Sequence, residues 1–283
     1  MSDTSVVDYE TPLRTGGKKL PPIDVLYWIM IISANTIGET AGDLISMTFN
    51  VGYGASTIIL MALFFGFVGL AVWTKIQHAS IYWIVIILSS TAGTTLSDLV
   101  ARNWLGTEEH GAYGAGVLAI LFTMVFIFTA WHFIAPRHGI DKPLSRMSEL
   151  FYWLAIVTSS TLGTAFGDYL THSTPPGFAN EIGFEHATEI LAGALVVVTL
   201  LTLLTKIPRD FCYWTAIVLT HPLGATAGDY MTKDKEDGGL ELGTIKSTII
   251  LVAIFLLIVG VKVILNWKKK SSDASPATAI AET

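Results

Sequence analysis

Four aspartates recur in nearly identical surroundings, and these are the residues with the clearest potential for chemistry. Each copy begins with Tyr-Trp, and an Asp follows the Trp after 15 residues: Trp28 and Asp43, Trp83 and Asp98, Trp153 and Asp168, Trp214 and Asp229. Each copy lies in an apolar run long enough to cross a bilayer. A carboxylate inside a membrane is costly unless it is protonated, hydrated or paired. The pattern therefore predicts proton or cation chemistry at four equivalent positions.

Further polar residues share a helix face with each Asp, because positions four, seven and eight residues earlier lie on the same side of a helix. In chain order these sets are Glu39, Thr36 and Asn35; Thr94, Thr91 and Ser90; Thr164, Thr161 and Ser160; and Ala225, Pro222 and His221. Oxygen donors of this kind suit Mg²⁺, Mn²⁺, Ca²⁺, Na⁺ or protons, and a His favours Mn²⁺ or another transition metal.

We therefore predict an ion-binding or transport site without catalytic residues and without a cofactor. Its candidate residues are Asp43, Asp98, Asp168, Asp229, Glu39, His221, Asn35, Thr94 and Thr164. The candidate metal ligands are the four aspartates and Glu39. Serines and threonines in such helices often bond only to their own backbone, and His221-Pro222 is equally consistent with a helix kink.

Small residues accompany each Asp at the positions five and one before it. The pairs are Gly38 and Gly42, Gly93 and Ser97, Gly163 and Gly167, and Gly224 and Gly228. Such pairs let two helix backbones approach closely and are in most cases packing devices. Close packing beside the carboxylates would allow the four aspartates to converge, and the sequence leaves open whether they meet at one site.

The composition places the chain among helical membrane proteins. Of 283 residues, 52% are hydrophobic and 14% charged, with a mean hydropathy of +0.57, against about 25% charged residues in soluble domains. The single cysteine, Cys212, excludes an intramolecular disulfide. No cleavable signal peptide is visible, and nothing indicates nucleic-acid binding.

The apolar runs predict an all-α integral membrane protein with eight transmembrane helices. The expected spans are 24–48, 55–74, 80–101, 112–135, 148–171, 186–205, 211–232 and 244–267. They form four two-helix repeats, 24–75, 79–135, 147–206 and 210–267. Repeats of two spans all enter the membrane in the same direction, which predicts parallel repeats around a pseudo-fourfold or pseudo-twofold axis along the membrane normal. The polar odd-numbered helices should lie inside. A polar arm, 1–23, precedes the bundle, and a disordered tail, 268–283, follows it.

The distribution of basic residues predicts the orientation. Twelve Lys and Arg fall on one side and four on the other, and Lys262 lies near the end of the eighth expected span. The group of four is Arg102, Lys233, Lys235 and Lys246. Both termini should therefore be cytoplasmic. The Tyr-Trp pairs fit a cytoplasmic interfacial belt, with each Asp ~22 Å further along its helix. The expected spans hold no set of cations that could pair all four aspartates, and Arg102, one turn beyond Asp98 at the end of the third span, is the one candidate counter-charge.

The repeated motifs around Trp28, Trp83, Trp153 and Trp214 resemble a bacterial family of four-repeat membrane proteins of unknown function, the domain of unknown function 347. The resemblance covers roughly residues 24–267 and implies a bacterial inner-membrane protein. It supplies no substrate. The fourth copy departs from the others by having His221-Pro222 where they have Asn or Ser followed by Thr.

Two functions remain open on the sequence. The first is a transporter for a small cation, a divalent metal such as manganese or a proton-coupled cation, with the lipid bilayer as its environment; a channel is a variant that the unequal repeats disfavour. The second is a non-transporting membrane scaffold or sensor with structural aspartates. An intramembrane hydrolase is not expected, because neither the paired aspartyl-protease motifs nor a Gly-x-Ser-x-Gly turn is present. The oligomeric state is not predicted.

Overall fold

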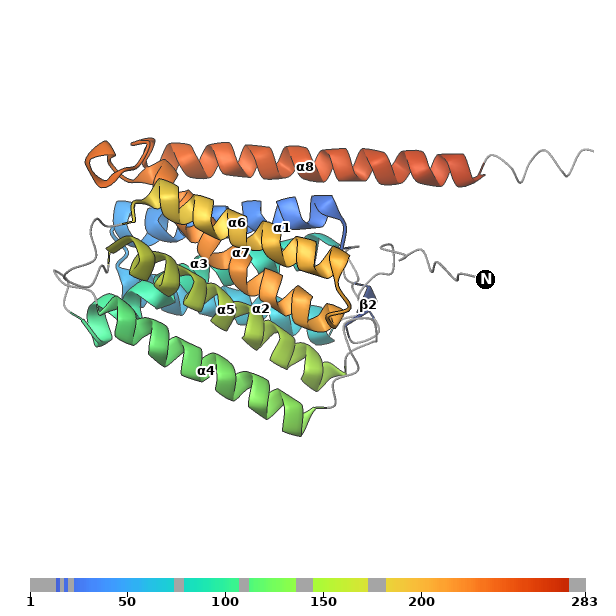
Figure 1. Ribbon diagram of the computed structural model, residues 1–283, viewed down its shortest axis with the longest axis horizontal. Helices are drawn as coiled ribbons and strands as arrows, with labels where there is room; N and C mark the ends of the chain where they lie inside the picture. The colour runs from blue at the N-terminus through green and yellow to red at the C-terminus, as the bar shows by residue number, and fades with distance from the viewer. Residues whose placement is uncertain are drawn as a thin grey trace, which may run out of the picture.

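The computed structural model describes residues 14–15, 18–19, 23–73, 79–106, 112–135, 145–172 and 182–274. Within them the chain forms eight long α-helices (Figure 1). These are α1 Val25–Asp43, α2 Tyr53–Trp73, α3 Ala79–Asp98, α4 Tyr113–Ile134, α5 Arg146–His172, α6 Phe184–Leu204, α7 Arg209–Thr232 and α8 Gly243–Ala274. Two two-residue strands, β1 Arg14–Thr15 and β2 Lys18–Lys19, pair antiparallel before α1.

The helices agree with the predicted spans to within a few residues, with two differences. Turns of π-helix extend α1 and α3 beyond their aspartates, as η1 Leu44–Thr48 and η2 Leu99–Trp104. By contrast, α5 and α7 continue past their aspartates as α-helix. A short 3₁₀ turn, η3 Lys235–Asp237, follows α7. In addition, α8 continues to Ala274, so the predicted disordered tail does not begin at residue 268. Residues 275–283 of that tail and most of the N-terminal arm lie outside the described residues.

Among the described residues, six helices are long and apolar enough to cross a membrane: α2, α3 with η2, α4, α5, α6 and α8. The remaining two, α1 and α7, are less apolar because polar groups such as Glu39, Asp43, His221 and Asp229 interrupt them. Several helices of this kind are typical of a multi-pass membrane protein.

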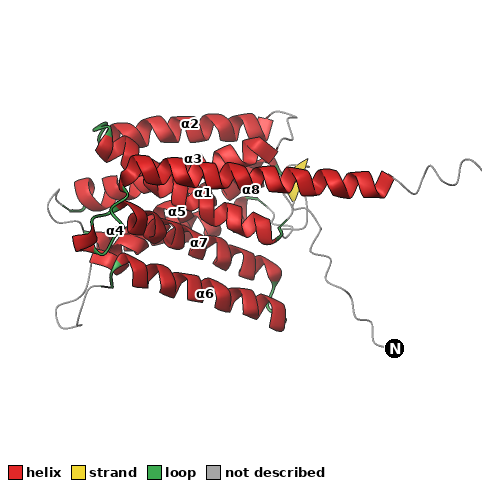
Figure 2. Ribbon diagram, turned by 90° about the horizontal axis from the view of Figure 1, so that it is seen from above, coloured by secondary structure: helices red, strands yellow, loops and turns green. Residues whose placement is uncertain are grey.

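The odd-numbered helices form a closed inner ring. α1 packs against α3, α3 against α5, α5 against α7, and α7 against α1. The even-numbered helices lie outside, and each packs mainly on the inner helix of the following repeat: α2 on α3, α4 on α5, α6 on α7, and α8 back on α1. Accordingly, α4 and α8 lie at opposite edges of the bundle in Figure 1, and α2 and α6 in Figure 2. Because α8 of the last repeat packs on α1 of the first, this packing also connects the two ends of the chain.

The N-terminal ends of the inner helices meet in a ring of tyrosines. The hydroxyl oxygens lie 2.7 Å apart for Tyr27 and Tyr82, 3.5 Å for Tyr82 and Tyr152, 3.2 Å for Tyr152 and Tyr213, and 3.2 Å for Tyr213 and Tyr27. All four residues are buried. The N-terminal ends of the inner helices therefore lie together, and these helices run in the same direction.

The tyrosines of the Tyr-Trp pairs face the inside of the bundle, whereas an interfacial belt would have them face lipid. Tyr27 lies on the same helix stripe as Ile31 and Gly38, because separations of four and seven residues share a face. That stripe faces the neighbouring inner helix, since the Tyr27 hydroxyl lies 2.7 Å from that of Tyr82 and Gly38 contacts Ser90. The tyrosines therefore point into the bundle and bond to one another. Trp83 and Trp153 are buried as well. The tyrosine of the preceding repeat packs against each of them, Tyr27 against Trp83 and Tyr82 against Trp153.

A layer of isoleucines follows the tyrosines. Each inner helix has an Ile four residues after its Tyr, namely Ile31, Ile86, Ile156 and Ile217, and all four are buried. One end of the inner ring is thus closed by two layers that all four repeats supply identically.

Candidate cation site

Glycine contacts set the distance between the inner helices. A Cβ atom added to any one of four motif glycines would lie less than 3.0 Å from the next inner helix. The contacts are Gly38 with Ser90, Gly93 with Ser160, Gly163 with His221, and Gly224 with Asn35. The same register therefore repeats at all four interfaces, and it brings the C-terminal ends of the inner helices, with their aspartates, close together.

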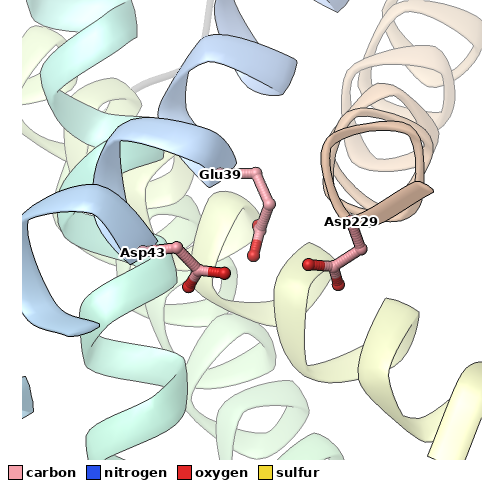
Figure 3. A group of neighbouring side chains, drawn as sticks. All are labelled: Glu39, Asp43 and Asp229. Carbon is pink, nitrogen blue, oxygen red and sulfur yellow. The ribbon is translucent and has the colours of Figure 1, made fainter. Parts of the chain in front are cut away.

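Three of the predicted carboxyl groups form a compact cluster. Oxygen atoms of Glu39, Asp43 and Asp229 all lie within 4.8 Å of one another, and all three residues are buried. Figure 3 shows the three side chains pointing into the same space, Glu39 and Asp43 from α1 and Asp229 from α7. Because α1 and α7 belong to the first and last repeats, closure of the ring creates this cluster.

Lys233, the residue after α7, binds two members of the cluster. Its Nζ atom lies 2.7 Å from Asp43 Oδ2 and 3.0 Å from Asp229 Oδ1. Burial lowers the pKa of Lys233, but the nearby Asp229 and Asp43 raise it more, so the pKa lies well above its ordinary value. Lys233 is therefore a charged ammonium group between two carboxylates. The sequence indicated it only as one of the basic residues outside the expected spans.

Glu39 receives hydrogen bonds from two other repeats. The hydroxyl groups of Thr94 on α3 and Thr164 on α5 donate to Glu39 Oε2 over 3.0 and 2.9 Å. Thr94 and Thr164 lie 3.3 Å from each other. These two threonines occupy the position in their repeats that Glu39 occupies in the first, so equivalent positions converge on one carboxylate oxygen.

The second aspartate has its own counter-charge, as predicted. Arg102 Nε donates to Asp98 Oδ1 over 3.0 Å, and the guanidinium carbon lies 6.0 and 5.7 Å from the ring centres of Tyr53 and Tyr113. Asp168 is buried on α5. Neither Asp98 nor Asp168 belongs to the three-carboxylate group found among the described residues.

His221 and Asn35 lie outside the carboxylate cluster. The Nδ1 atom of His221 is 2.8 Å from the carbonyl oxygen of Ile217 and 3.5 Å from Ser159 Oγ, and α7 continues through Pro222. The amide nitrogen of Asn35 donates to Thr220 Oγ1, while its amide oxygen is buried and accepts no hydrogen bond from the described atoms. Both residues also pack against motif glycines, so their placement is explained in part by packing.

The donor set fits a hard cation. Carboxylate and hydroxyl oxygens from α1, α3, α5 and α7 are brought together, and the described part of the cluster contains no sulfur or imidazole ligand. Such donors suit Mg²⁺, Mn²⁺, Ca²⁺ or protons rather than soft metals.

The four copies of this architecture match a known sequence family. A model described as a repeat of unknown function, DUF347, matches residues 26–77, 81–136, 151–207 and 212–266. The chain belongs to this family. Each DUF347 repeat spans one inner and one outer helix, in agreement with the repeats predicted from the sequence. Comparison with curated proteins and with solved structures finds no match.

Proposed function

We propose that this DUF347 protein is a membrane transporter for a small cation, a divalent metal such as Mn²⁺ or a cation exchanged for protons. The observation that supports this most directly is the charge of the cluster. Three buried carboxyl groups, Glu39, Asp43 and Asp229, lie within 4.8 Å of one another, and the ammonium group of Lys233 contacts two of them. Buried carboxylates at this spacing require further positive charge or protons.

The two ends of the inner ring support transport rather than an open channel. The carboxylates lie at the end where the inner helices finish, whereas the tyrosine and isoleucine layers close the other end. A cation that reaches Glu39 must therefore wait for a rearrangement of those layers before it can continue. Access to one end at a time is the defining behaviour of a transporter.

The proposal includes the membrane topology. All eight helices cross the bilayer, with the pseudo-fourfold axis of the inner ring along the membrane normal. In this arrangement α8 and α6 shield α1 and α7 from lipid. Both termini face the cytoplasm, as the excess of basic residues on that side predicts. The membrane is the inner membrane of a bacterium, and the protein performs no enzymatic reaction.

Ion flux into proteoliposomes tests the function. We expect saturable uptake of Mn²⁺, Mg²⁺, Ca²⁺ or Na⁺, or a dependence on a proton gradient, in the native protein. Asp43→Asn and Asp229→Asn should abolish it because each removes a carboxylate of the cluster. Glu241→Gln is the matched control, since Glu241 is exposed and pairs only peripherally with Lys235 at 3.7 Å.

A scaffold is the second candidate, and one observation favours it: Lys233 links α1 to α7 through Asp43 and Asp229, as a structural tie would. In that case the Asn variants lose thermal stability, and neither they nor the native protein bind or move any of these ions. Uptake that disappears in a variant with native-like stability excludes the scaffold.

A further inference from the structure

The ammonium group of Lys233 lies where a bound cation would lie. It is 2.7 Å from Asp43 Oδ2 and 3.0 Å from Asp229 Oδ1, and these two carboxylates belong to the same three-oxygen group as Glu39. A divalent cation coordinated by Asp43 Oδ2 and Asp229 Oδ1 would occupy the position of the ammonium group. Like charges at this separation also repel strongly in a buried site. The ammonium group and the cation therefore exclude each other.

We propose that Lys233 is a built-in competitor for the transported cation: the cation enters by displacing the ammonium group, and the return of the ammonium group releases it. This inference rests on the proposed transport function and names a specificity-determining residue for it. No covalent bond changes; one charged group replaces another on the same two carboxylates. A cation must then outcompete an ammonium ion, which favours divalent over monovalent ions.

The backbone around Lys233 is fixed while its side chain has a route to solvent. Lys233 N donates to Asp229 O over 2.8 Å, and Glu241 N donates to Lys233 O over 2.9 Å. Two further bonds, from Leu240 N to Tyr230 O and from Leu242 N to Met231 O, fold the segment against the end of α7. The side chain is 25% exposed, so the flexible stem can carry the ammonium group outward without unfolding the loop.

Arg102 offers an internal contrast. It also follows its aspartate by four residues, yet it contacts the single carboxylate of Asp98 and packs against the rings of Tyr53 and Tyr113. Cation–π contacts and a planar guanidinium hold it in place. Only the ammonium group of Lys233, in the fourth repeat, is therefore displaced by the cation. Arg102 stays paired with Asp98 while the cation binds.

Mn²⁺ binding to the purified full chain tests the inference. Lys233→Met should bind Mn²⁺ at least about tenfold more tightly than the native protein, because a competing charge at ion-pair distance is gone. Lys233→Arg keeps the charge and should not tighten binding. Lys235→Met removes the same charge from the same loop, where Lys235 is 75% exposed, and should leave the affinity unchanged. In flux assays Lys233→Met should lower KM and slow turnover, since release becomes the slow step.

A second measurement uses the native protein and does not depend on the stability of a variant. Acetylation of lysines is followed by mass spectrometry with and without Mn²⁺. Mn²⁺ should accelerate modification of Lys233 several-fold and leave Lys235 unchanged. Equal modification rates with and without saturating Mn²⁺ would overturn the inference, as would a folded Lys233→Met protein whose Mn²⁺ affinity does not increase.

The outcomes separate this inference from the proposed function. Tighter binding in Lys233→Met without flux of any ion supports the competition but refutes transport. Flux in the native protein, with equal Mn²⁺ affinity in Lys233→Met, supports transport but refutes the competition.

Discussion

The two ends of the inner ring differ in how the four repeats contribute. At the N-terminal end every repeat supplies the same residues, a Tyr and an Ile, and the tyrosine hydroxyls bond to one another around the ring. At the C-terminal end every repeat supplies an Asp, but the residues around it differ. The tyrosine and isoleucine end is thus symmetric, whereas the aspartate end, which holds the proposed cation site, is not.

The divergence at the aspartate end follows the helix face. Four residues before each Asp lie Glu39, Thr94, Thr164 and Ala225, and four residues after it lie Met47, Arg102, His172 and Lys233. The first repeat supplies the extra carboxylate, the second and third supply hydroxyl donors, and the fourth supplies the ammonium group. Four similar repeats can therefore build one asymmetric site, because each repeat places a different group beside its Asp. The tyrosine and isoleucine layers need no such differences, so all four repeats keep the same residues there.

The largest expected effect comes from a substitution that disrupts packing between the inner helices, which positions both the tyrosines and the aspartates. Gly38→Ala places a methyl group less than 3.0 Å from Ser90, including its carbonyl carbon, which cannot move independently of α3. We expect about 3 kcal/mol of destabilisation or loss of folded protein, as for severe overpacking. Thermal unfolding of purified protein measures the cost.

Gly193→Ala provides the control for this substitution. Gly193 lies on α6 with no atom within 4 Å of an added Cβ, so the same change should be neutral or stabilising by up to about 1 kcal/mol. Equal tolerance of both substitutions would show that the glycine contacts do not determine the spacing of the inner helices.

The next largest effect belongs to the aspartate end. Glu39→Gln removes the charge but keeps an amide oxygen that can accept from Thr94 and Thr164. We expect Mn²⁺ affinity to fall at least about tenfold while the unfolding temperature stays close to native, because only the interaction with the cation is lost. Calorimetric titration together with thermal unfolding separates these two results. An unchanged affinity would remove Glu39 from the site.

Substitutions at the tyrosine end should each lower stability by a small and similar amount. Each Tyr→Phe substitution at positions 27, 82, 152 and 213 removes one hydroxyl from a ring of buried hydrogen bonds, at a cost of about 1–2 kcal/mol. Thermal unfolding of the four variants should give similar values, and Mn²⁺ affinity should not change. A cost several times larger at one tyrosine would mean that this end is as asymmetric as the other.

Local periodicity was sufficient to predict the repeats, the parallel inner helices and the pairing of Arg102 with Asp98. These features depend on residues within one helix or on a repeated spacing. The inward tyrosines were missed because a tyrosine suits either a membrane interface or a buried hydrogen-bonded ring. The stripe shared by Tyr27, Ile31 and Gly38 contained the deciding signal.

Long-range placement could not be read from one sequence. Lys233 and Asp43 are separated by 190 positions, and their contact depends on the closure of α7 onto α1. The spacing from Asp229 to Lys233 equals that from Asp98 to Arg102, and this could have identified Lys233 as a partner of its own Asp. Nothing local indicates that the fourth outer helix packs on the first inner helix.

The smallest expected effect concerns a charge pair at the tyrosine end, outside the ring. Lys262 Nζ on α8 lies 3.0 Å from Asp24 Oδ1, which also accepts from Tyr27 N at the start of α1. Lys262→Met keeps the apolar stem and leaves this helix cap intact, so we expect a loss of at most about 1 kcal/mol, as for partly exposed pairs. Thermal unfolding at low and high salt measures it, since salt should reduce the difference from the native protein. If Lys262→Met instead altered Mn²⁺ affinity as strongly as Lys233→Met, the positive charges at the two ends would be equivalent for cation binding, and the distinction between a symmetric closure and an asymmetric site would fail.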